Sequence, residues 1–456
     1  MSKFGPRFLA IKTLFRWLRC HRKRRPPLES VIEEAYSEYG ELNSKDRALV
    51  REIATGVVRN LTLLEWLISR YLKNKGKIDL TLKTALMVGA YQILFLKKVP
   101  DHAALNETVE ATKRLLKGRS SRGSGFVNAV LRRIVKEKKN ITESYILELP
   151  PEIRYSHPEW IVKRWNERFG LNQTISILKA NNKRPPVTLR VNLLRCNREE
   201  LIRLLEDHGI KAIPGKYSPQ AVILDGHFGD IRGLPGFKEG YFQVQDEGAQ
   251  LIGFLVDPKP GEVVLDACAG VGGKSTHLVE LSRGRATIFA CEKTVSRKAA
   301  LSENLKRLGM ISQVKVMEEG DCLRAFSKGN KVYFDKILLD APCSGLGVIR
   351  RHPDIKWNRV VSDITQLRQL QMTLLQGLKR LVKVKGKLIY ATCTLEPEET
   401  TLLIEDFLKN NPSWELMDPS PFIPGSASGV LIKKHFFYST PPKTDGFFGA
   451  VLRRVK

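Results

Sequence analysis

The chain has 456 residues and carries 76 Lys and Arg against 48 Asp and Glu, a formal net charge of +28. Apolar residues make up 42% and charged residues 27%, which are ordinary globular values and exclude wholesale disorder and fibrous repeats. The length predicts about three domains. A chain this basic is expected to bind a polyanion, and nucleic acid is the first candidate.

Cysteine usage and hydropathy indicate the compartment. The seven cysteines are scattered and form no CxxC pair, so neither a zinc knuckle nor a disulfide framework is indicated. The eight histidines show no paired ligand spacing, and no stretch reaches the ~18–20 uncharged apolar residues of a membrane span. We therefore expect a cytoplasmic protein that needs no metal and no membrane.

Residues 1–140 show only helical periodicity. The expected helices lie near residues 6–19, 27–40, 44–57, 60–73, 78–96, 103–117 and 123–138, with short polar connections such as 74–76. The first 28 residues carry nine Lys and Arg and no acid, a pattern also found in transit peptides. Because Phe8, Ile11, Leu14, Phe15 and Leu18 share one helical face, we favour a first core helix.

The same block holds most of the excess charge. Its 30 basic and 13 acidic residues give a net charge of +17, and the other 316 residues hold 46 and 35, or +11. A solvated basic surface is one interpretation. The concentration of charge favours RNA contact instead, because phosphate contacts dominate affinity for nucleic acids.

A second region extends from 141 to 242. One helix is expected around Pro158–Ala180, ended by the prolines at 185 and 186. Then Val187–Val191 is expected to form a strand, Arg198–His208 a helix and Ala221–Leu224 a strand. This order is typical of a small α+β module, ferredoxin-like or RRM-like. No aromatic RNA-binding signature is visible, so base stacking on that sheet is not supported.

From 243 to 456, strands alternate with helices. The expected strands are Val263–Asp266, Thr287–Cys291, Val314–Met317, Lys336–Asp340 and Lys387–Ala391. The expected helices between them include Lys274–Leu281, Ser296–Leu308 and Asp363–Leu381. This alternation predicts a doubly wound, Rossmann-like parallel sheet.

A glycine-rich turn follows the first of these strands. The segment Cys268-Ala269-Gly270-Val271-Gly272-Gly273-Lys274 opens the next helix, where backbone N–H groups can meet a ligand. It lacks the spacing of a P-loop. Glu292, about twenty residues on, is suited to ribose hydroxyls, and Asp321 follows the third strand. Together they predict an adenosine-containing cofactor.

Two cysteines follow the fourth and fifth strands. Asp340 and Cys343 lie in Asp340-Ala341-Pro342-Cys343, and Cys393 in Tyr390-Ala391-Thr392-Cys393. Carbon 5 of cytosine is a poor nucleophile, but a thiolate that adds at carbon 6 activates it toward a methyl donor, and a carboxyl group stabilises the adduct. The remaining cysteines are expected to be structural; those assigned this role are Cys20, Cys196, Cys291 and Cys322.

Longer motifs around these residues resemble one known family. They are DAPCSGLGVIRRHPDIKW at 340–357, YATCTLEPEE at 390–399, FQVQDEGAQL at 242–251 and the loop at 266–274. They resemble the RsmB/Sun family of the NOL1/NOP2/Sun group of RNA cytosine-C5 methyltransferases. The helical block resembles the NusB-like RNA-binding domain of that family, through residues 76–79, 101–107 and 125–132.

The resemblance implies S-adenosyl-L-methionine as methyl donor and 16S ribosomal RNA, or a small-subunit precursor, as substrate. It implies Cys393 as nucleophile, Cys343 in product release, and Asp340 in positioning the base. Cofactor contacts are implied at Cys268, Ala269, Gly270, Val271, Gly272, Gly273, Lys274, Glu292, Asp321 and Asp340. Val271 stands where the family usually has proline, which makes the turn less rigid.

The sequence therefore predicts a monomeric RNA cytosine-C5 methyltransferase of three parts. These are an all-α NusB-like domain at 1–140, linker helices with a small α+β module at 141–242, and a Rossmann-like α/β methyltransferase domain at 243–456. The target cytosine must leave its stack to reach Cys393. Two alternatives remain: the same chemistry on tRNA, and a non-catalytic RNA-binding assembly factor that has kept the fold.

Overall fold

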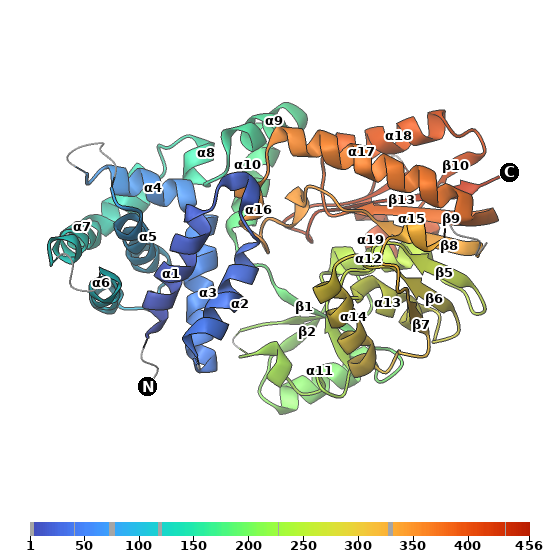
Figure 1. Ribbon diagram of the computed structural model, residues 1–456, viewed down its shortest axis with the longest axis horizontal. Helices are drawn as coiled ribbons and strands as arrows, with labels where there is room; N and C mark the ends of the chain where they lie inside the picture. Colours follow the sequence, from blue (N-terminus) through green and yellow to red (C-terminus); the bar gives the residue numbers. More distant parts are fainter. Residues whose placement is uncertain are drawn as a thin grey trace. The chain divides into compact units, whose positions relative to one another are not determined.

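The computed structural model describes residues 4–40, 42–72, 78–116, 121–226, 228–326, 332–433 and 435–456 (Figure 1). The chain divides into two compact units. The first contains residues 1–184 together with Ile349–Arg359, and the second contains Pro185–Val348 and Val360–Lys456. The expected polar connection at 74–76 and part of the motif at 76–79 lie outside the described residues.

Helices build the first unit. They are α1 Pro6–Arg19, α2 Leu28–Tyr39, α3 Ser44–Arg59, α4 Leu61–Ser69, α5 Leu80–Phe95, α6 Asp101–Leu116, α7 Ser121–Asn140, α8 Pro151–Arg154, α9 Glu159–Phe169, α10 Leu171–Asn182 and α16 Ile355–Asn358. The seven helices expected before residue 140 are confirmed. Helix α1 belongs to the core, because Leu9, Ile11 and Leu14 are fully buried.

The expectation of one helix over 158–180 was wrong. Two helices, α9 and α10, meet at Gly170, whose φ of 76° lies in the left-handed region. A residue without a Cβ adopts that conformation at little cost, so the glycine ends α9 and begins α10. The apolar periodicity continues across the break and concealed it.

A segment that follows the Cys343 loop belongs to the first unit. Trp357 donates its indole N–H to the carbonyl of Val58 at 2.7 Å, and the Asp354 carboxylate accepts the Leu28 amide at 3.2 Å. The buried Lys356 amine donates to the carbonyl of Arg59 at 2.9 Å. Burial and the nearby Arg59 guanidinium hold the pKa of Lys356 well below its usual range. The sequence analysis did not anticipate this packing of residues 349–359 on the helical block.

The second unit begins with a small antiparallel sheet in the order β2-β3-β1-β4. Its elements are β1 Val187–Val191, α11 Arg198–Asp207, β2 Ala212–Pro214, β3 Ala221–Leu224 and β4 Phe242–Val244. Leu201 and Leu205 of α11 pack with Leu189 and Phe242 of the sheet in one buried cluster. The expected β1, α11 and β3 are confirmed, whereas β2 and β4 were missed because each has only three residues.

A nine-stranded sheet forms the rest of this unit, in the order β11-β12-β13-β9-β8-β5-β6-β7, with β10 paired to β13. The strands are β5 Val263–Asp266, β6 Thr287–Ala290, β7 Val314–Val316, β8 Phe334–Asp340, β9 Val382–Thr392, β10 Trp414–Met417, β11 Ile432–Lys433, β12 Phe436–Ser439 and β13 Phe447–Arg454. The helices are α12 Glu247–Val256, α13 Gly273–Leu281, α14 Val295–Leu308, α15 Cys322–Ala325, α17 Val361–Leu378, α18 Thr401–Lys409 and α19 Gly425–Leu431.

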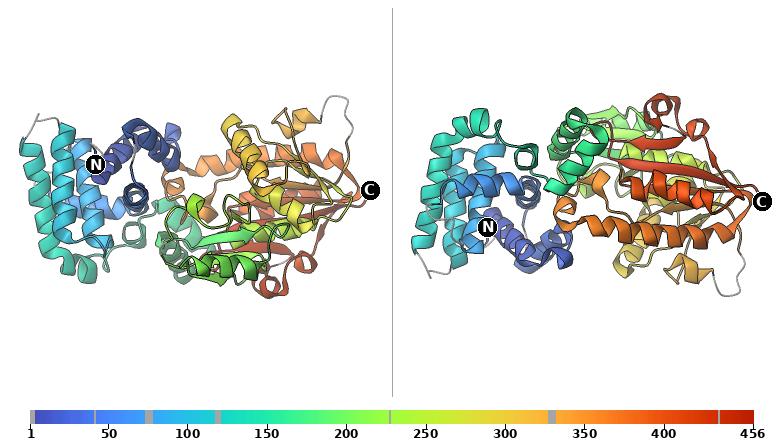
Figure 2. Two further views of the ribbon diagram at one scale, coloured as in Figure 1. Left: turned by 90° about the horizontal axis from the view of Figure 1, so that it is seen from below. Right: turned by 90° about the horizontal axis from the view of Figure 1, so that it is seen from above.

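The five expected strands, β5 to β9, are confirmed as parallel neighbours. The sheet as a whole is mixed, because β13, which the sequence analysis did not predict, pairs antiparallel with β9 and β12 pairs antiparallel with β13. Helices α12, α13 and α14 cover one face of the sheet, and α17 and α18 cover the other (Figure 2). The strand order reverses between β5 and β8, so ligands are expected at the carboxyl ends of those two strands.

No helix within the described ranges is long and apolar enough to cross a membrane.

Candidate active site

The two cysteines expected at the site lie next to each other. Asp340 at the end of β8 is in register with Ala391 of β9, so the turns after both strands leave the sheet together. The Cys343 and Cys393 sulfurs are 3.3 Å apart, within hydrogen-bonding distance for two thiols, and neither cysteine forms a disulfide. The parallel pairing of β8 and β9 thus brings together two thiols that are 50 residues apart in sequence.

The two thiols have different surroundings. The hydrogen bond with Cys393, together with burial and the charges of Glu399 and Asp340, holds the pKa of Cys343 well above that of a free thiol. Cys343 is therefore a thiol that keeps its proton in the ordinary pH range.

Asp340 pairs with the lysine of the glycine loop. The Lys274 amine lies 2.6 Å from the Asp340 carboxylate, and the lysine side chain is only 11% exposed. Burial alone would lower the pKa of Lys274, but the Asp340 carboxylate outweighs it and the pKa is raised. Lys274 therefore stays charged beside Asp340, and the pair links the glycine loop to the turn that carries Cys343.

A buried network of hydrogen bonds holds the turn that carries Cys343 in place. The Glu399 carboxylate accepts the Ser344 amide at 2.8 Å and the Gln371 side-chain amide at 3.0 Å. The hydroxyls of Ser344 and Thr394 are 2.8 Å apart, which joins the residues that follow the two cysteines. Burial raises the pKa of Glu399. Sequence reasoning did not single out Glu399 or Gln371, although the acid stands inside the motif at 390–399.

The glycine-rich turn has the backbone expected of a ligand cradle. Gly270 and Gly272 have φ values of 58° and 85°, a region that L side chains rarely adopt. A Cβ on Gly270 would meet no described atom within 4 Å, so open space lies beside the backbone there. Gly273 begins α13, and the side-chain amide of Asn304 holds the carbonyl of Val271 at 3.0 Å. A hydrogen bond therefore restrains Val271, at the position where the related motif has proline.

Glu292 and Asp321 follow the next two strands. One Glu292 oxygen accepts the Thr294 amide at 2.7 Å, and no hydrogen bond to the other oxygen occurs within the described parts of the chain. Asp321 caps α15 by accepting the Leu323 amide at 3.0 Å, and the Lys293 amine lies 3.8 Å from its other oxygen. Glu292 therefore keeps an acceptor for a ligand, whereas Asp321 already has protein partners.

Asp266 is a buried acid that the sequence analysis did not assign to the site. It ends β5, and one of its oxygens accepts the Ser275 hydroxyl at 2.7 Å. Its other oxygen is buried and has no hydrogen-bond partner among the described residues. Burial raises the pKa of Asp266 to about 6. The sequence could have indicated Asp266 as a site residue, because it ends the first strand of the Rossmann-like sheet, next to the glycine-rich turn.

These features define a class of protein: an α/β enzyme with a glycine-rich ligand loop at the sheet reversal and a pair of thiols beside it. Within the described residues, no group of three or more His, Cys, Asp and Glu is arranged to hold a metal ion.

Comparisons with known proteins identify the family. Residues 253–453 match the family described as 16S rRNA methyltransferase RsmB/F. Residues 5–136 match the NusB family, and residues 157–231 match the ferredoxin-like domain of RsmF/B-like methyltransferases. The expected fold class is confirmed, and the small module is ferredoxin-like.

Relatives cover almost the whole chain. Ribosomal RNA small subunit methyltransferase B of Escherichia coli O6:K15:H31 (strain 536 / UPEC) is 38% identical over 424 residues, 90% of this chain and 96% of that protein. The crystal structure of PH0851 has a TM-score of 0.79, with 28% identity and 99% of each chain covered. A methyltransferase homolog from Pyrococcus horikoshii has a TM-score of 0.57, with 29% identity over 67% of this chain and 97% of that one.

The chain therefore belongs to the RsmB/F family of 16S rRNA methyltransferases.

Proposed function

We propose that this rRNA methyltransferase transfers a methyl group from S-adenosyl-L-methionine to carbon 5 of a cytosine in 16S rRNA, through a covalent adduct between Cys393 and carbon 6. The observation that carries the proposal is the pair of sulfurs 3.3 Å apart at the carboxyl ends of β8 and β9. Methylation of an exocyclic amine or a ribose hydroxyl needs no thiol, whereas carbon 5 needs a nucleophile at carbon 6.

In the proposed reaction each residue of the site has a separate role. The Cys393 thiolate forms a bond to carbon 6, and the displaced electron pair makes carbon 5 nucleophilic. Asp340 positions the base by accepting a hydrogen bond from its exocyclic amino group, and the charged Lys274 beside it stabilises the negative charge that develops on the ring in the adduct. After methylation, a base removes the carbon 5 proton and the bond to Cys393 breaks. The protonated Cys343 thiol lies next to that bond and assists release.

The chain's own residues fit the proposed cofactor. The open space beside Gly270 leaves the backbone accessible, and the second oxygen of Glu292 is available for a ribose hydroxyl. Gly273 begins a nine-residue helix whose N-terminal amides favour a carboxylate. When bound, S-adenosyl-L-methionine supplies an electrophilic methyl group. Asp321 remains the proposed contact for the adenine ring. Its carboxylate already caps α15, so we expect the ring to lie beside this side chain.

Glu292→Ala is expected to weaken binding of S-adenosyl-L-methionine roughly ten- to a hundredfold, because a charge-assisted bond contributes on the order of 1.5–3 kcal/mol. Glu292→Asp is the matched control and should lose less affinity, since it keeps the charge. Calorimetric titration with the cofactor and, separately, with RNA measures the effect. An unchanged dissociation constant for the cofactor would assign the ribose to another acid.

An exposed row of cations on α7 is the proposed RNA contact of the helical domain. Arg132, Arg133, Lys136 and Lys139 are all exposed on this one helix. They belong to the block that carries +17, and neutralised phosphates release counterions, which makes affinity depend on salt. Deleting the whole block is a poor test, because the buried Lys356 and Trp357 pack against it.

Replacing these four α7 residues by glutamine is expected to lower RNA affinity and to reduce the slope of log affinity against log salt by about 3. The charge-matched control replaces four exposed cations of the second unit, Lys259, Arg283, Arg285 and Lys385. Salt titrations of RNA binding compare the two variants. Equal loss in both would show that net charge alone matters and that α7 is a solvated surface.

Release of tritium from RNA that contains [5-³H]cytosine tests the proposed chemistry. Carbon 5 methylation releases the label with S-adenosyl-L-methionine present, whereas methylation at any other atom retains it. A non-catalytic assembly factor would release none and transfer no methyl group. Parallel assays with 16S rRNA and tRNA decide between the two RNA substrates, and the proposal requires the rRNA to be preferred.

A further inference from the structure

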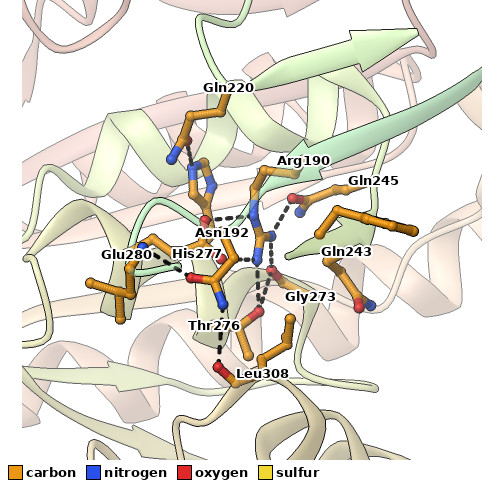
Figure 3. Close-up of polar contacts among 12 residues, drawn as sticks. Arg190, Asn192, Gln220, Gln243, Gln245, Gly273, Thr276, His277, Glu280 and Leu308 are labelled. Atoms are coloured by element: carbon orange, nitrogen blue, oxygen red, sulfur yellow. Dashed lines mark hydrogen bonds and ion pairs between the residues drawn. The ribbon is translucent and has the colours of Figure 1, made fainter. Parts of the chain in front are cut away.

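Arg190 of β1 is a fully buried arginine in the ferredoxin-like module. Its Nε and Nη2 atoms donate to the two oxygens of the buried Glu280, at 2.9 and 2.7 Å. Nη2 also donates to the Thr276 hydroxyl at 2.9 Å. Both acceptors belong to α13, the helix that the glycine loop opens, so this one side chain joins the small module to the helix below the loop (Figure 3).

The remaining nitrogen of Arg190 reaches the loop itself. Nη1 donates to the carbonyl of Gly273, the last glycine of the loop, and to the side-chain oxygen of Gln245 (Figure 3). A guanidinium has five N–H donors in a fixed plane, and all five bonds are made here. The same planar group therefore holds the first turn of α13 at Gly273 and its last turn at Glu280.

A second contact holds α13 against the module, and another contact joins the module to α14. The ring of His277 is buried and its Nε2 meets the side-chain oxygen of Gln220, in the turn before β3. Asn192 donates to the carbonyl of Gly240 at 2.8 Å, within the module, and to that of Leu308 at the end of α14 at 3.2 Å. Figure 3 shows the contact with Leu308. Of these module residues, Arg190 alone donates to the carbonyl of a residue in the loop at 268–274.

A buried ion pair is weak evidence of a purely stabilising role. Removing two charges from water is costly, and apolar residues of similar volume often stabilise a core as well or better. What an apolar pair does not provide is a donor for a main-chain carbonyl at a ligand loop. The hydrogen bond from Arg190 to Gly273 therefore indicates that the direction of the Gly273 carbonyl matters at this loop.

We infer that Arg190 is a positioning residue for the cofactor loop: it fixes the Gly273 carbonyl and with it the direction of the amides at the start of α13. The inference rests on the proposed cofactor, because the loop is the proposed site of S-adenosyl-L-methionine. The small module thereby contributes to cofactor binding without touching the cofactor. Ligand affinity at a loop depends on how much order must be gained upon binding, so a loosened loop binds more weakly.

The test uses the full-length protein and two variants with a matched control. Arg190→Lys keeps a positive charge for Glu280 but cannot span Glu280, Thr276 and Gly273 together. The double variant Arg190→Met with Glu280→Met removes the charges as a pair and guards against misfolding of the single variant. The control is Arg307→Met. Arg307 joins the same module to α14 through the carbonyls of Phe237 and Phe242, both at 3.0 Å, and donates no hydrogen bond to residues 268–274.

Three measurements are made on each protein: the dissociation constant for S-adenosyl-L-methionine, KM for the cofactor and for RNA, and hydrogen exchange of the amides of 268–276 without cofactor. Both Arg190 variants are expected to weaken cofactor binding by about tenfold or more, to raise KM for the cofactor but not for RNA, and to speed exchange in the loop. Arg307→Met is expected to change the cofactor constants less than threefold.

Wild-type cofactor affinity and loop exchange in both Arg190 variants would overturn the inference. Equal weakening by Arg307→Met would also overturn it, since the effect would then come from attachment of the module as a whole. Failure of the wild-type protein to bind S-adenosyl-L-methionine would instead overturn the proposed function, and the exchange measurement would still report whether Arg190 restrains the loop.

Discussion

Replacing Cys393 by alanine is expected to abolish methyl transfer, lowering turnover by at least about a thousandfold, while S-adenosyl-L-methionine still binds. The thiolate activates the base, and no other described thiol has the same position: Cys343, 3.3 Å away, has its pKa held well above the ordinary value. Cofactor affinity should persist because the loop at 268–274 and Glu292 are unchanged.

The measurements for this variant are tritium release, methyl incorporation into rRNA and a calorimetric titration with the cofactor. Cys322→Ala is the control, since Cys322 is a buried cysteine that we expect to be structural. Full turnover by the Cys393 variant would refute its assignment as the nucleophile. Loss of cofactor binding as well would point to a disturbed fold instead of lost chemistry.

Replacing Cys343 by alanine is expected to give a different defect: a covalent protein–RNA complex that accumulates and survives SDS. The thiol of Cys343 lies beside the sulfur that must leave carbon 6, and its raised pKa supplies a protonated group there. Without it the adduct still forms through Cys393 but resolves slowly. Turnover falls for this reason, whereas the first round of methylation proceeds.

Denaturing gel electrophoresis of each cysteine variant with RNA and cofactor distinguishes the two roles. Accumulation of the complex only with Cys343→Ala supports the proposed assignment. Accumulation only with Cys393→Ala would exchange the roles of the two cysteines. The double variant should form no complex in either case, which controls for other nucleophiles.

Local periodicity was enough to predict most of the elements. Helices α1 to α7 and strands β5 to β9 were expected from apolar spacing, because each must bury one stripe or face against the core. The failures have physical causes. Gly170 breaks a helix without interrupting the apolar pattern. Strands β10, β11 and β12 have at most four residues each and so leave little periodicity, and β13 is buried on both faces and shows no alternation.

The chemistry of the site was also contained in the sequence. A glycine-rich turn after one strand and cysteines after two others must meet at one edge, since parallel strands end on the same side of a sheet. Residue types and spacing thus predicted that Cys393, Cys343 and Asp340 lie at one site and suggested the proposed reaction, and the family resemblance supplied the separate roles of the two cysteines. The boundaries at 140 and 242 remain predictions, and residues 349–359, which follow the Cys343 loop in sequence, belong to the helical unit.

The sequence by itself determined three kinds of part, a basic helical block, a small α+β module and a Rossmann-like sheet, and which side chains each offers. Only the tertiary structure decided the partners: Cys343 with Cys393, Lys274 with Asp340, and Arg190 with Glu280 and the Gly273 carbonyl. These pairs join residues 50 to 90 positions apart. Local propensity does not encode such contacts, because they arise when separately formed elements pack and each buried polar group must find a partner.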